Sequence, residues 1–418
     1  MDTSASTMKW ASALSTRPSL EAAVAEVAAQ AQERLQAQPD LALVFISAAF
    51  ASEFSRLMPL LQEQLDVPIW LGCSGGGVIG TSAEGEAVEA EGQPALSLSL
   101  ASLPGVTLQS FHCSSEDLPD LDSPPDRWSE LIGVDPQTQP HFILMADPFS
   151  AGINDLLQGL DFAYPGAVKV GGLASIGSIN RSCGLFCGGE LIEEGVVGVA
   201  LSGNVVLDAI VAQGCRPIGQ PYRVAEGEKN ILLKLETDSD LGTASLKTPM
   251  DVLQELFQSL DEADRELAQH SLFIGVEQSG FKPNLERGDF LIRNLIGVDP
   301  KVGAIAIGDR VRPGQRIQFH LRDAQTSADD LRMLLDRYQS QHEKAQAAGA
   351  LMFACMGRGA GLYEEANFDS GLFNRYFEQI PLSGFFCGGE IGPIGGTTFL
   401  HGYTSVFGIC RQPEQASK

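Results

Sequence analysis

Short hydrophobic runs alternate with helical stripes along the whole chain. Four runs have the length and composition of buried central strands, at residues 43–46, 142–145, 272–276 and 350–356. Between them, hydrophobic residues recur every three or four positions, as on one face of a helix. Three such stripes begin at residues that cap helices, Ser19, Thr248 and Ser327, and the third is expected to end at Gly349. The alternation predicts an α/β fold.

Glycine-rich turns punctuate this pattern at three places, residues 72–77, 184–190 and 384–390. The last two share the pentapeptide Phe-Cys-Gly-Gly-Glu. Convergence on a tight turn would give the same match, but the flanking order of elements also repeats, which favours duplication. The sequence therefore predicts two related layered α/β domains with mixed sheets, derived from an internal duplication.

A change of composition over residues 214–248 places the domain boundary near residue 236. The expected division is a strand and helix at 1–39 packed on the first domain, a first domain at 40–235 and a second at 236–418.

The first glycine turn fits three interpretations. Residues 72–76 match the nucleophile elbow G-x-S-x-G around Ser74, and residues 75–80 match a dinucleotide-binding fingerprint. Both motifs require a helix directly afterwards. Residues 81–94 are instead polar and acidic, without a hydrophobic stripe, and are typical of a hairpin loop before a strand at 96–100. The third interpretation, a glycine turn between two strands, is therefore favoured.

Charge and cysteine content exclude several classes of function. The 418 residues include 53 Asp and Glu against 28 Lys and Arg, a net charge of −25 that repels nucleic acids and anionic membrane surfaces. The eight cysteines are scattered, as reduced thiols are. There is no secretory signal pattern and no hydrophobic stretch of membrane-spanning length. We expect a cytoplasmic protein without nucleic-acid or membrane partners.

Metal and cofactor motifs are weak. Cys183 and Cys187 stand four residues apart, but no second Cys or His pair accompanies them at a spacing typical of metal sites. Buried thiols explain both cysteines better. We expect no metal, no cofactor and no catalytic residue.

The strongest candidate site lies where the strand at 350–356 runs into a turn of small residues. The turn holds Cys355, Gly357, Arg358 and Gly359. Ligands usually bind at the carboxyl ends of strands in α/β sheets, and arginine can bind a carboxylate through two hydrogen bonds at once. Its charge would also lower the pKa of Cys355. Glu390, after the matching glycine turn, could bind an ammonium group.

The alternatives at this site are structural. Arg358 and Glu390 could form an internal salt bridge, and Cys355 could be an inert core residue.

Several segments resemble the FIST family. In the second half these are Arg293-Asn-Leu-Ile-Gly-Val-Asp-Pro300, Ala304-Ile-Ala-Ile-Gly-Asp309, Gln318-Phe-His-Leu-Arg-Asp323, Cys355-Met-Gly-Arg-Gly359 and Gly384-Phe-Phe-Cys-Gly-Gly-Glu-Ile-Gly-Pro393, which are similar to the FIST C-terminal domain. Residues 40–235, with Gly72-Cys-Ser74 after a strand, resemble the FIST N-terminal domain. The family pattern continues Thr-Ala-Gly-Glu-Ile, whereas this chain has Gly75-Gly-Gly-Val-Ile79 and lacks the acidic residue.

The resemblance implies a sensory module that binds small ligands in bacterial signalling proteins and that is fused to an F-box in eukaryotic ubiquitin-ligase adaptors. It establishes no catalytic mechanism. With two FIST domains filling the chain, the implied protein is a standalone sensor that signals through a partner protein.

We therefore expect a sensor of amino acids or other small carboxylates, with ligand contacts from Cys355, Gly357, Arg358, Gly359, Glu390 and Arg293. Secondary candidates are Cys73, Ser74 and Glu190. An enzyme with Ser74 or Cys355 as nucleophile and a pure protein-interaction scaffold are the alternatives.

Overall fold

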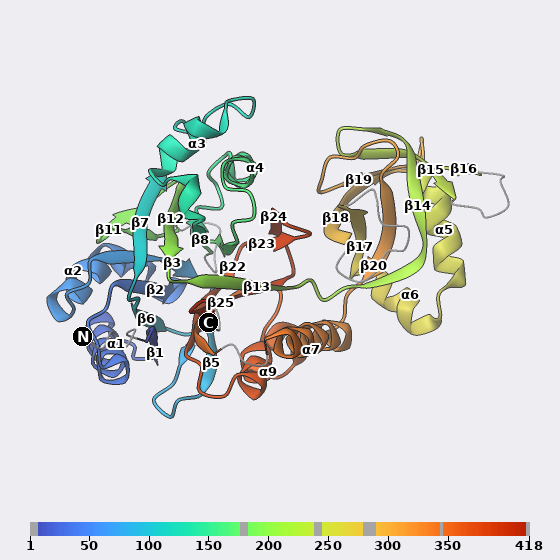
Figure 1. Cartoon of the computed structure of the whole chain (residues 1–418). Coiled ribbons are helices and arrows are strands. Elements are labelled where there is room, and N and C mark those ends of the chain that lie inside the picture. The colour runs from blue at the N-terminus through green and yellow to red at the C-terminus, as the bar shows by residue number, and fades with distance from the viewer. Residues whose placement is uncertain (1–6, 176–182, 238–244, 279–289, 343–345, 415–418) are drawn as a thin grey trace. The chain divides into compact units, whose positions relative to one another are not determined.

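The fold is that of a computed structural model, which describes residues 7–175, 183–237, 245–278, 290–342 and 346–414. The chain divides into two compact units, a larger one of Met1–Ala212 with Arg332–Lys418 and a smaller one of Gln213–Leu331. The larger unit contains three mixed sheets with helices, which confirms the α/β class expected from the sequence (Figure 1). These two units are divided by packing and separate at residues 212/213 and 331/332. The domain boundary expected at residues 235/236 stays a prediction.

The larger unit consists of three repeats of one strand and helix order. Repeat 1 (9–102) contains β1 (Lys9–Ser15), α1 (Leu20–Leu35), β2 (Leu41–Ser47), the 3-10 helix η1 (Ala48–Glu53), α2 (Phe54–Gln64), β3 (Ile69–Gly75), β4 (Gly77–Thr81), β5 (Ala87–Glu91) and β6 (Leu96–Ser102). Repeat 2 (106–203) contains β7 (Val106–Cys113), α3 (Pro125–Ile132), the 3-10 helix η2 (Pro136–Thr138), β8 (His141–Ala146), α4 (Ile153–Ala163), β9 (Lys169–Leu173), β10 (Leu185–Cys187), β11 (Glu190–Ile192) and β12 (Val196–Gly203).

Repeat 3 (206–212 and 332–411) is interrupted by the smaller unit, which follows its first strand. It contains β13 (Val206–Ala212), most of α7 (Ala324–Gln341), β21 (Ala347–Cys355), α8 (Ala360–Tyr363), α9 (Phe368–Tyr376), β22 (Leu382–Cys387), β23 (Glu390–Ile394), β24 (Thr397–His401) and β25 (Ser405–Arg411).

Each repeat builds one six-stranded sheet on the same plan. The strand orders are β1-β6-β2-β3-β10-β11, β7-β12-β8-β9-β23-β24 and β13-β25-β21-β22-β4-β5. In each sheet the third and fourth strands form the one parallel pair, and the other neighbours are antiparallel. The last two strands of each sheet are a hairpin that comes from another repeat, so the three repeats exchange hairpins in a cycle.

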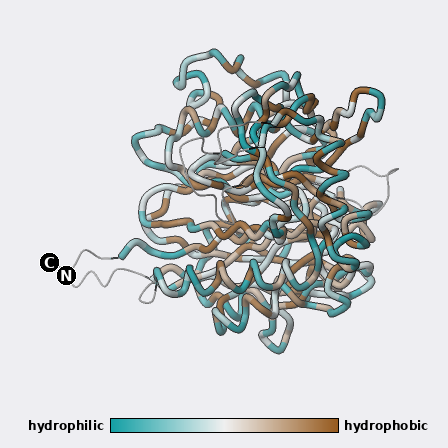
Figure 2. The backbone as a smooth tube through the Cα atoms, turned by 90° about the vertical axis from the view of Figure 1, so that its right-hand side faces the viewer, coloured by the Kyte–Doolittle hydropathy of each residue, from teal (hydrophilic) through white to brown (hydrophobic). Residues whose placement is uncertain are grey.

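The parallel strands are continuously hydrophobic because both of their faces are covered. Phe45 of β2, Ile143 of β8 and Phe353 of β21 face one common core. The alternate residues of β2 pack instead with residues of α1 and α2. The three sheets thus share an inner core, and hydrophobic residues follow the strands through the interior (Figure 2).

The shared pentapeptide does not mark the repeat. Phe186 to Glu190 forms the two-glycine turn of the β10–β11 hairpin, where Cys187 pairs with Glu190. Phe386 to Glu390 instead joins β22 in one sheet to β23 in another. The equivalent of the Gly188-Gly189 turn is Gly395-Gly396 between β23 and β24, with the same φ values of 60° and 87°. The internal repeat is therefore present in three copies, and the two pentapeptides occupy different places in their copies.

The smaller unit is a closed antiparallel barrel. Its elements are β14 (Arg216–Glu228), β15 (Ile231–Thr237), β16 (Leu246–Lys247), α5 (Pro249–Ser259), α6 (Glu262–Ala268), β17 (Leu272–Glu277), β18 (Phe290–Asp299), β19 (Ala304–Ile307) and β20 (Arg316–Leu321). The strand order β14-β20-β17-β18-β19-β15 closes because β14 also pairs with β15. Hydrophobic side chains such as Val224, Leu232 and Phe319 fill its core.

Two expected helix starts are confirmed, and one is not. The Ser19 hydroxyl accepts a hydrogen bond from Ala22 N, and Thr248 forms a reciprocal capping box with Asp251. The third helix was expected to begin at Ser327 and to close at Gly349. It begins about one turn earlier, at Ala324, and ends at Gln341, whereas Gly349 lies in β21.

Candidate ligand-binding site

In each repeat, the first strand of the parallel pair ends at an equivalent position in the sheet. Val44, Leu144 and Met352 pair with Gly72, Gly171 and Gly384 in the three sheets. Three residues further along stand Ser47, Asp147 and Cys355. Since ligands of α/β sheets bind beyond this edge, the three positions are equivalent candidates.

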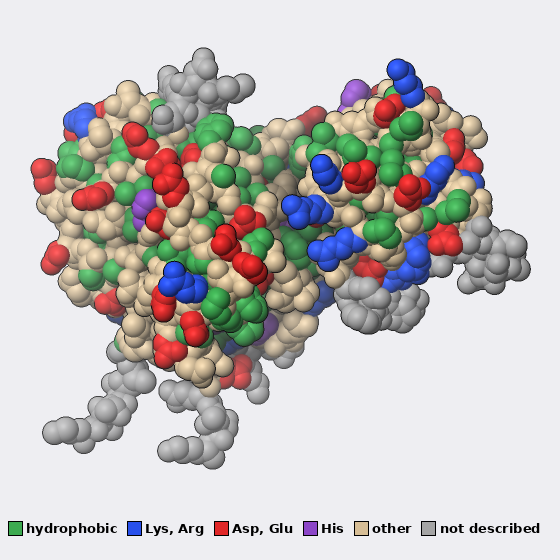
Figure 3. All heavy atoms as spheres, turned by 90° about the horizontal axis from the view of Figure 1, so that it is seen from above, with side chains coloured by type: hydrophobic (Ala, Val, Ile, Leu, Met, Phe, Trp, Pro, Cys, Tyr) green, Lys and Arg blue, Asp and Glu red, His purple; other side chains and the backbone are tan. Residues whose placement is uncertain are grey.

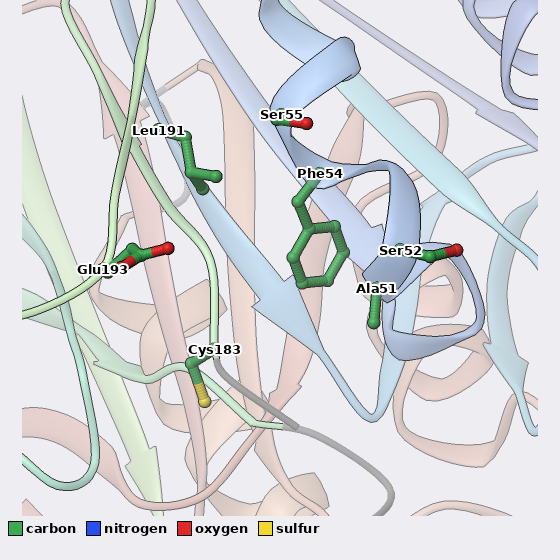
Figure 4. A pocket seen from close by; sticks show the side chains of 7 residues that line it. All are labelled: Ala51, Ser52, Phe54, Ser55, Cys183, Leu191 and Glu193. Carbon is green, nitrogen blue, oxygen red and sulfur yellow. The ribbon is translucent and has the colours of Figure 1, made fainter. Parts of the chain in front are cut away.

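A cavity of about 480 Å³ lies beyond β2 in repeat 1. Ala51, Phe54 and Leu191 supply a hydrophobic wall, from η1, α2 and β11. The polar lining consists of Ser52, Ser55, Cys183 and Glu193. Figure 4 shows the Glu193 carboxylate directed across the cavity toward Phe54.

A second cavity, of about 380 Å³, lies beyond β8 in repeat 2. Cys183 and Glu193 line it as well, so the two cavities share a wall. Asp147, Phe149 and Glu194 belong to its lining. We refer to the two together as the Cys183 cavities.

Cys183 is buried and its thiol stays protonated at neutral pH. Burial raises its pKa to about 11, Asp147 adds to this, and a hydrogen bond with the Ser74 hydroxyl lowers it in part. Its sulfur is thus a weak hydrogen-bonding group in the wall of the cavities and not an activated nucleophile.

The secondary candidates Cys73 and Ser74 lie in β3 and are fully buried. Ser74 Oγ accepts from Gly184 N at 3.1 Å and donates to the Ser175 carbonyl at 3.4 Å. Burial raises the pKa of Cys73 well above its usual value. The strand β4 follows at Gly77, as the interpretation of a glycine turn between strands requires, and no helix follows Ser74. These two residues hold β3 in place behind Cys183.

The third equivalent position, in repeat 3, is occupied by protein groups. Arg358 is 0% exposed, and its guanidinium binds both carboxylate oxygens of Asp369, at 2.6 and 3.0 Å. Tyr363 Oη completes the cluster, 2.5 Å from Arg358 Nη2. Arg358 forms a salt bridge with Asp369, whereas the alternative expected from the sequence paired it with Glu390. The expected ligand contact of Arg358 stays a prediction, and in this structure the guanidinium is enclosed and bound to Asp369.

The neighbours of Arg358 in the expected site are also engaged. Cys355 is half-buried at the end of β21, with Gly357 next to it. At Gly359 φ is +63°, and a Cβ there would lie 2.4 Å from Glu91 Oε1. Glu390 is 0% exposed and accepts a hydrogen bond from Thr404 N at 3.0 Å.

The remaining two expected residues lie elsewhere. Arg293 is in the barrel, where its Nε donates to Asp309 Oδ2 at 3.0 Å. Glu190 is exposed at the start of β11 and lines neither of the Cys183 cavities. Sequence reasoning missed Cys183 as a lining residue, and also Phe54, Asp147 and Glu193. The signal that would have found them is the threefold repeat, which makes the ends of β2 and β8 equivalent to the predicted end of β21.

Glu89, in the β4–β5 hairpin, is a buried carboxylate beside the Arg358 cluster. Its Oε1 accepts from Ser370 N at 2.7 Å, and the side chain faces Asp369, with Glu91 on the same strand. Burial is the main reason that its pKa rises to about 7, with Asp369 second.

We expect Glu89→Gln to stabilise the protein at alkaline pH. Because the folded-state pKa lies above the usual 4.5, this residue's contribution to stability is greatest below pH 4.5 and is lost as pH rises to 7. The variant should therefore gain about 3 kcal/mol over the parent at pH 8 and nothing at pH 4. Thermal unfolding across this range measures the difference, and the exposed Glu84→Gln is the matched control. An equal gain at both pH values would contradict the assignment.

In the described part of the chain, no group of three or more His, Cys, Asp or Glu side chains could hold a metal ion. None of the helices within the described ranges has the length and hydrophobicity that a membrane crossing needs.

Comparison with known proteins gives a consistent family. A model of the FIST N domain matches residues 40–238, and a model of the FIST C domain matches residues 249–393. An uncharacterized protein of Mycobacterium bovis is 32% identical over 94% of this chain and 96% of its own length. One of Mycobacterium tuberculosis is 32% identical over 95% of this chain and 98% of its own length. An F-box/LRR-repeat protein of Arabidopsis thaliana is 25% identical over 49% of this chain and 42% of its own length.

The two family models together span most of the chain and agree with the segments singled out in the sequence. The chain therefore belongs to the FIST family and carries both its N and its C domain.

Proposed function

We propose that this protein is a sensor that binds a small molecule in the Cys183 cavities and signals through a partner protein. FIST domains are associated with signal transduction and small-ligand sensing. The observation that carries the proposal is the pair of cavities beyond β2 and β8, which share Cys183 and Glu193. Their position is the usual one for ligands of α/β sheets, and their size suits a small molecule.

The enzyme alternative receives less support. Cys355, one of the two nucleophiles named for that alternative, lines neither of the Cys183 cavities. At the cavities themselves, Ser74 Oγ is enclosed and bonded to backbone groups, and the Cys183 thiol is protonated at neutral pH. A nucleophile needs an accessible atom and an adjacent base or a lowered pKa. Neither residue meets this requirement, so we propose no reaction at the cavities.

A thermal-shift screen of the full chain tests the proposal. The compounds are amino acids, nucleotides, small carboxylates, amines and thiols. A ligand at a hundred times its Kd should add about 2.7 kcal/mol to the free energy of unfolding, which raises Tm by about 5 to 10 °C.

A cavity-filling variant assigns any shift to this site. Ala51→Phe should abolish the shift because the larger side chain occupies the first cavity. Ala83→Phe, in the exposed loop before β5, is the matched control and should retain it. If no compound shifts Tm, the scaffold alternative gains; if both variants keep the shift, the ligand binds elsewhere.

A further inference from the structure

The Cys183 cavities have acidic walls. Glu193 lines both cavities, and Asp147 and Glu194 line the second. Neither set of described lining residues contains a lysine or an arginine. Among these residues a bound carboxylate would meet like charges, whereas a cation would meet opposite ones.

The carboxylates of Glu193 and Glu194 are exposed and have no hydrogen-bonding or ionic partner among the described residues. Asp147 is held in place instead, since its Oδ2 accepts from Phe149 N at 3.2 Å and Ser150 Oγ at 2.8 Å. Two buried acidic side chains elsewhere in this chain, Glu277 and Asp369, do have cationic partners, in Arg316 and Arg358. Among the described residues, the negative charges of Glu193 and Glu194 thus have no cationic partner.

The lining of the two cavities is otherwise largely hydrophobic and partly aromatic. Phe54 and Leu191 line the first cavity, and Phe149, which is 72% exposed, lines the second. Hydrophobic walls bind the carbon skeleton of a ligand, and aromatic rings also attract cations. In Figure 4 the Glu193 carboxylate and the Phe54 ring lie on opposite sides of the cavity.

The net negative charge of the larger unit also favours the binding of cations. It carries 34 Asp and Glu against 14 Lys and Arg. Acidic side chains outnumber basic ones on the face of this unit seen in Figure 3. Such a field concentrates cations near the surface and slows the approach of anions.

We propose that the Cys183 cavities bind a primary amine with a hydrophobic body, with Glu193 binding the ammonium group. This inference rests on the proposed function and replaces its expected ligand class. The carboxylate ligands expected from the sequence depended on Arg358, and that guanidinium is bound to Asp369.

Calorimetric titration of the full chain with two matched series tests the ligand class. The amines are tyramine, phenethylamine and hexylamine, and the carboxylates that carry the same carbon skeletons are 3-(4-hydroxyphenyl)propionate, 3-phenylpropionate and heptanoate. We expect at least one amine to bind and none of the carboxylates. The amine affinity should fall as sodium chloride is raised, because salt screens the partly exposed carboxylates.

Two charge-neutralising variants locate the ammonium group. Glu193→Gln should weaken amine binding about tenfold or more, whereas Glu190→Gln, at the start of β11 and outside the cavities, should leave it unchanged. Both changes are exposed and remove one negative charge, so a general effect of net charge would weaken binding equally in the two variants.

The outcomes separate the two proposals. Binding of carboxylates but not of amines overturns the amine inference and leaves the sensor function standing. Amine binding that Glu193→Gln does not weaken overturns the assignment of the ammonium site. If neither series binds, the amine inference fails, and the thermal-shift screen decides the proposed function separately.

Discussion

Replacing Gly384 by alanine should prevent the larger unit from folding. A Cβ at Gly384 would lie 1.8 Å from the carbonyl oxygen of Met352 on the neighbouring parallel strand. Both atoms belong to central, fully buried strands, so the clash moves backbone and not a flexible side chain. We expect a loss of at least about 4 kcal/mol, the range reached only by the most disruptive substitutions.

The same experiment tests the threefold repeat. Gly72 and Gly171 occupy the equivalent positions, and their added Cβ atoms would lie 2.0 and 1.8 Å from the carbonyl oxygens of Val44 and Leu144. All three alanine variants should be insoluble or unfolded by circular dichroism. Gly371→Ala in α9, where nothing lies within 4 Å, should instead gain about 0.5 to 1 kcal/mol. Normal folding of any of the three strand variants would contradict the equivalence.

Arg358→Met should destabilise the larger unit by about 3 to 5 kcal/mol, because it leaves the buried Asp369 carboxylate without its cation. The ion pair is almost completely enclosed, with side-chain exposures of 0% and 1%. Urea unfolding at neutral pH measures the loss. The effect is on stability, whereas the sequence analysis had expected this residue to affect ligand affinity.

Two comparisons separate the ion pair from packing. The double variant Arg358→Met, Asp369→Leu removes both charges and should recover most of the lost stability. Arg56→Met, whose guanidinium is half-exposed beside Glu21 and Glu53, should change stability little. A double variant as unstable as the single one would show that the guanidinium contributes through its shape and not its charge.

The central strands could be predicted from the sequence because both faces of each parallel strand pair are covered in this fold. Residues 43–46, 142–145 and 350–356 are hydrophobic at every position or nearly so, and they correspond to β2, β8 and β21. A strand with one solvent face would have shown alternation instead.

The ends of helices and the turns were harder to predict from the sequence, because different physical causes select the same residue types. At the start of α7, Asp323 Oδ1 accepts from Thr326 N, and the cap-type residue Ser327 lies inside the helix. Gly349 was expected to end that helix. It is a glycine for another reason, since a Cβ there would lie 2.2 Å from the Trp10 ring.

One hexapeptide shows how far context overrides local sequence. Leu-Ile-Gly-Val-Asp-Pro ends α3 and begins η2 at residues 131–136, with Gly133 in the left-handed conformation at the end of the helix. At residues 295–300 the same letters continue β18. Pairing with β19 decides the second case, and no window of six residues contains that information.

The sequence analysis placed the candidate site at the end of β21 in repeat 3, whereas the site proposed from the structure lies at the equivalent ends of β2 and β8. Cys355 stands at the end of β21, as Asp147 follows β8 and Ser47 ends β2. Whether a strand end carries a cavity depends on what packs over it. In repeat 3 that is the Arg358–Asp369 pair, whose members are eleven residues apart in sequence. The sequence shows the arginine but not which carboxylate reaches it.

The exchange of hairpins among the three sheets has a consequence for synthesis on the ribosome. The β4–β5 hairpin pairs with β22 through Ile79 and Gly384, about 300 residues apart. At a translation rate of about 5 to 20 residues per second, the hairpin waits on the order of 15 to 60 s for its partner strand. During that time its unpaired edge can join other chains. Yield in a cell should therefore depend on chaperones that cover this nascent edge more than on the final stability of the folded protein.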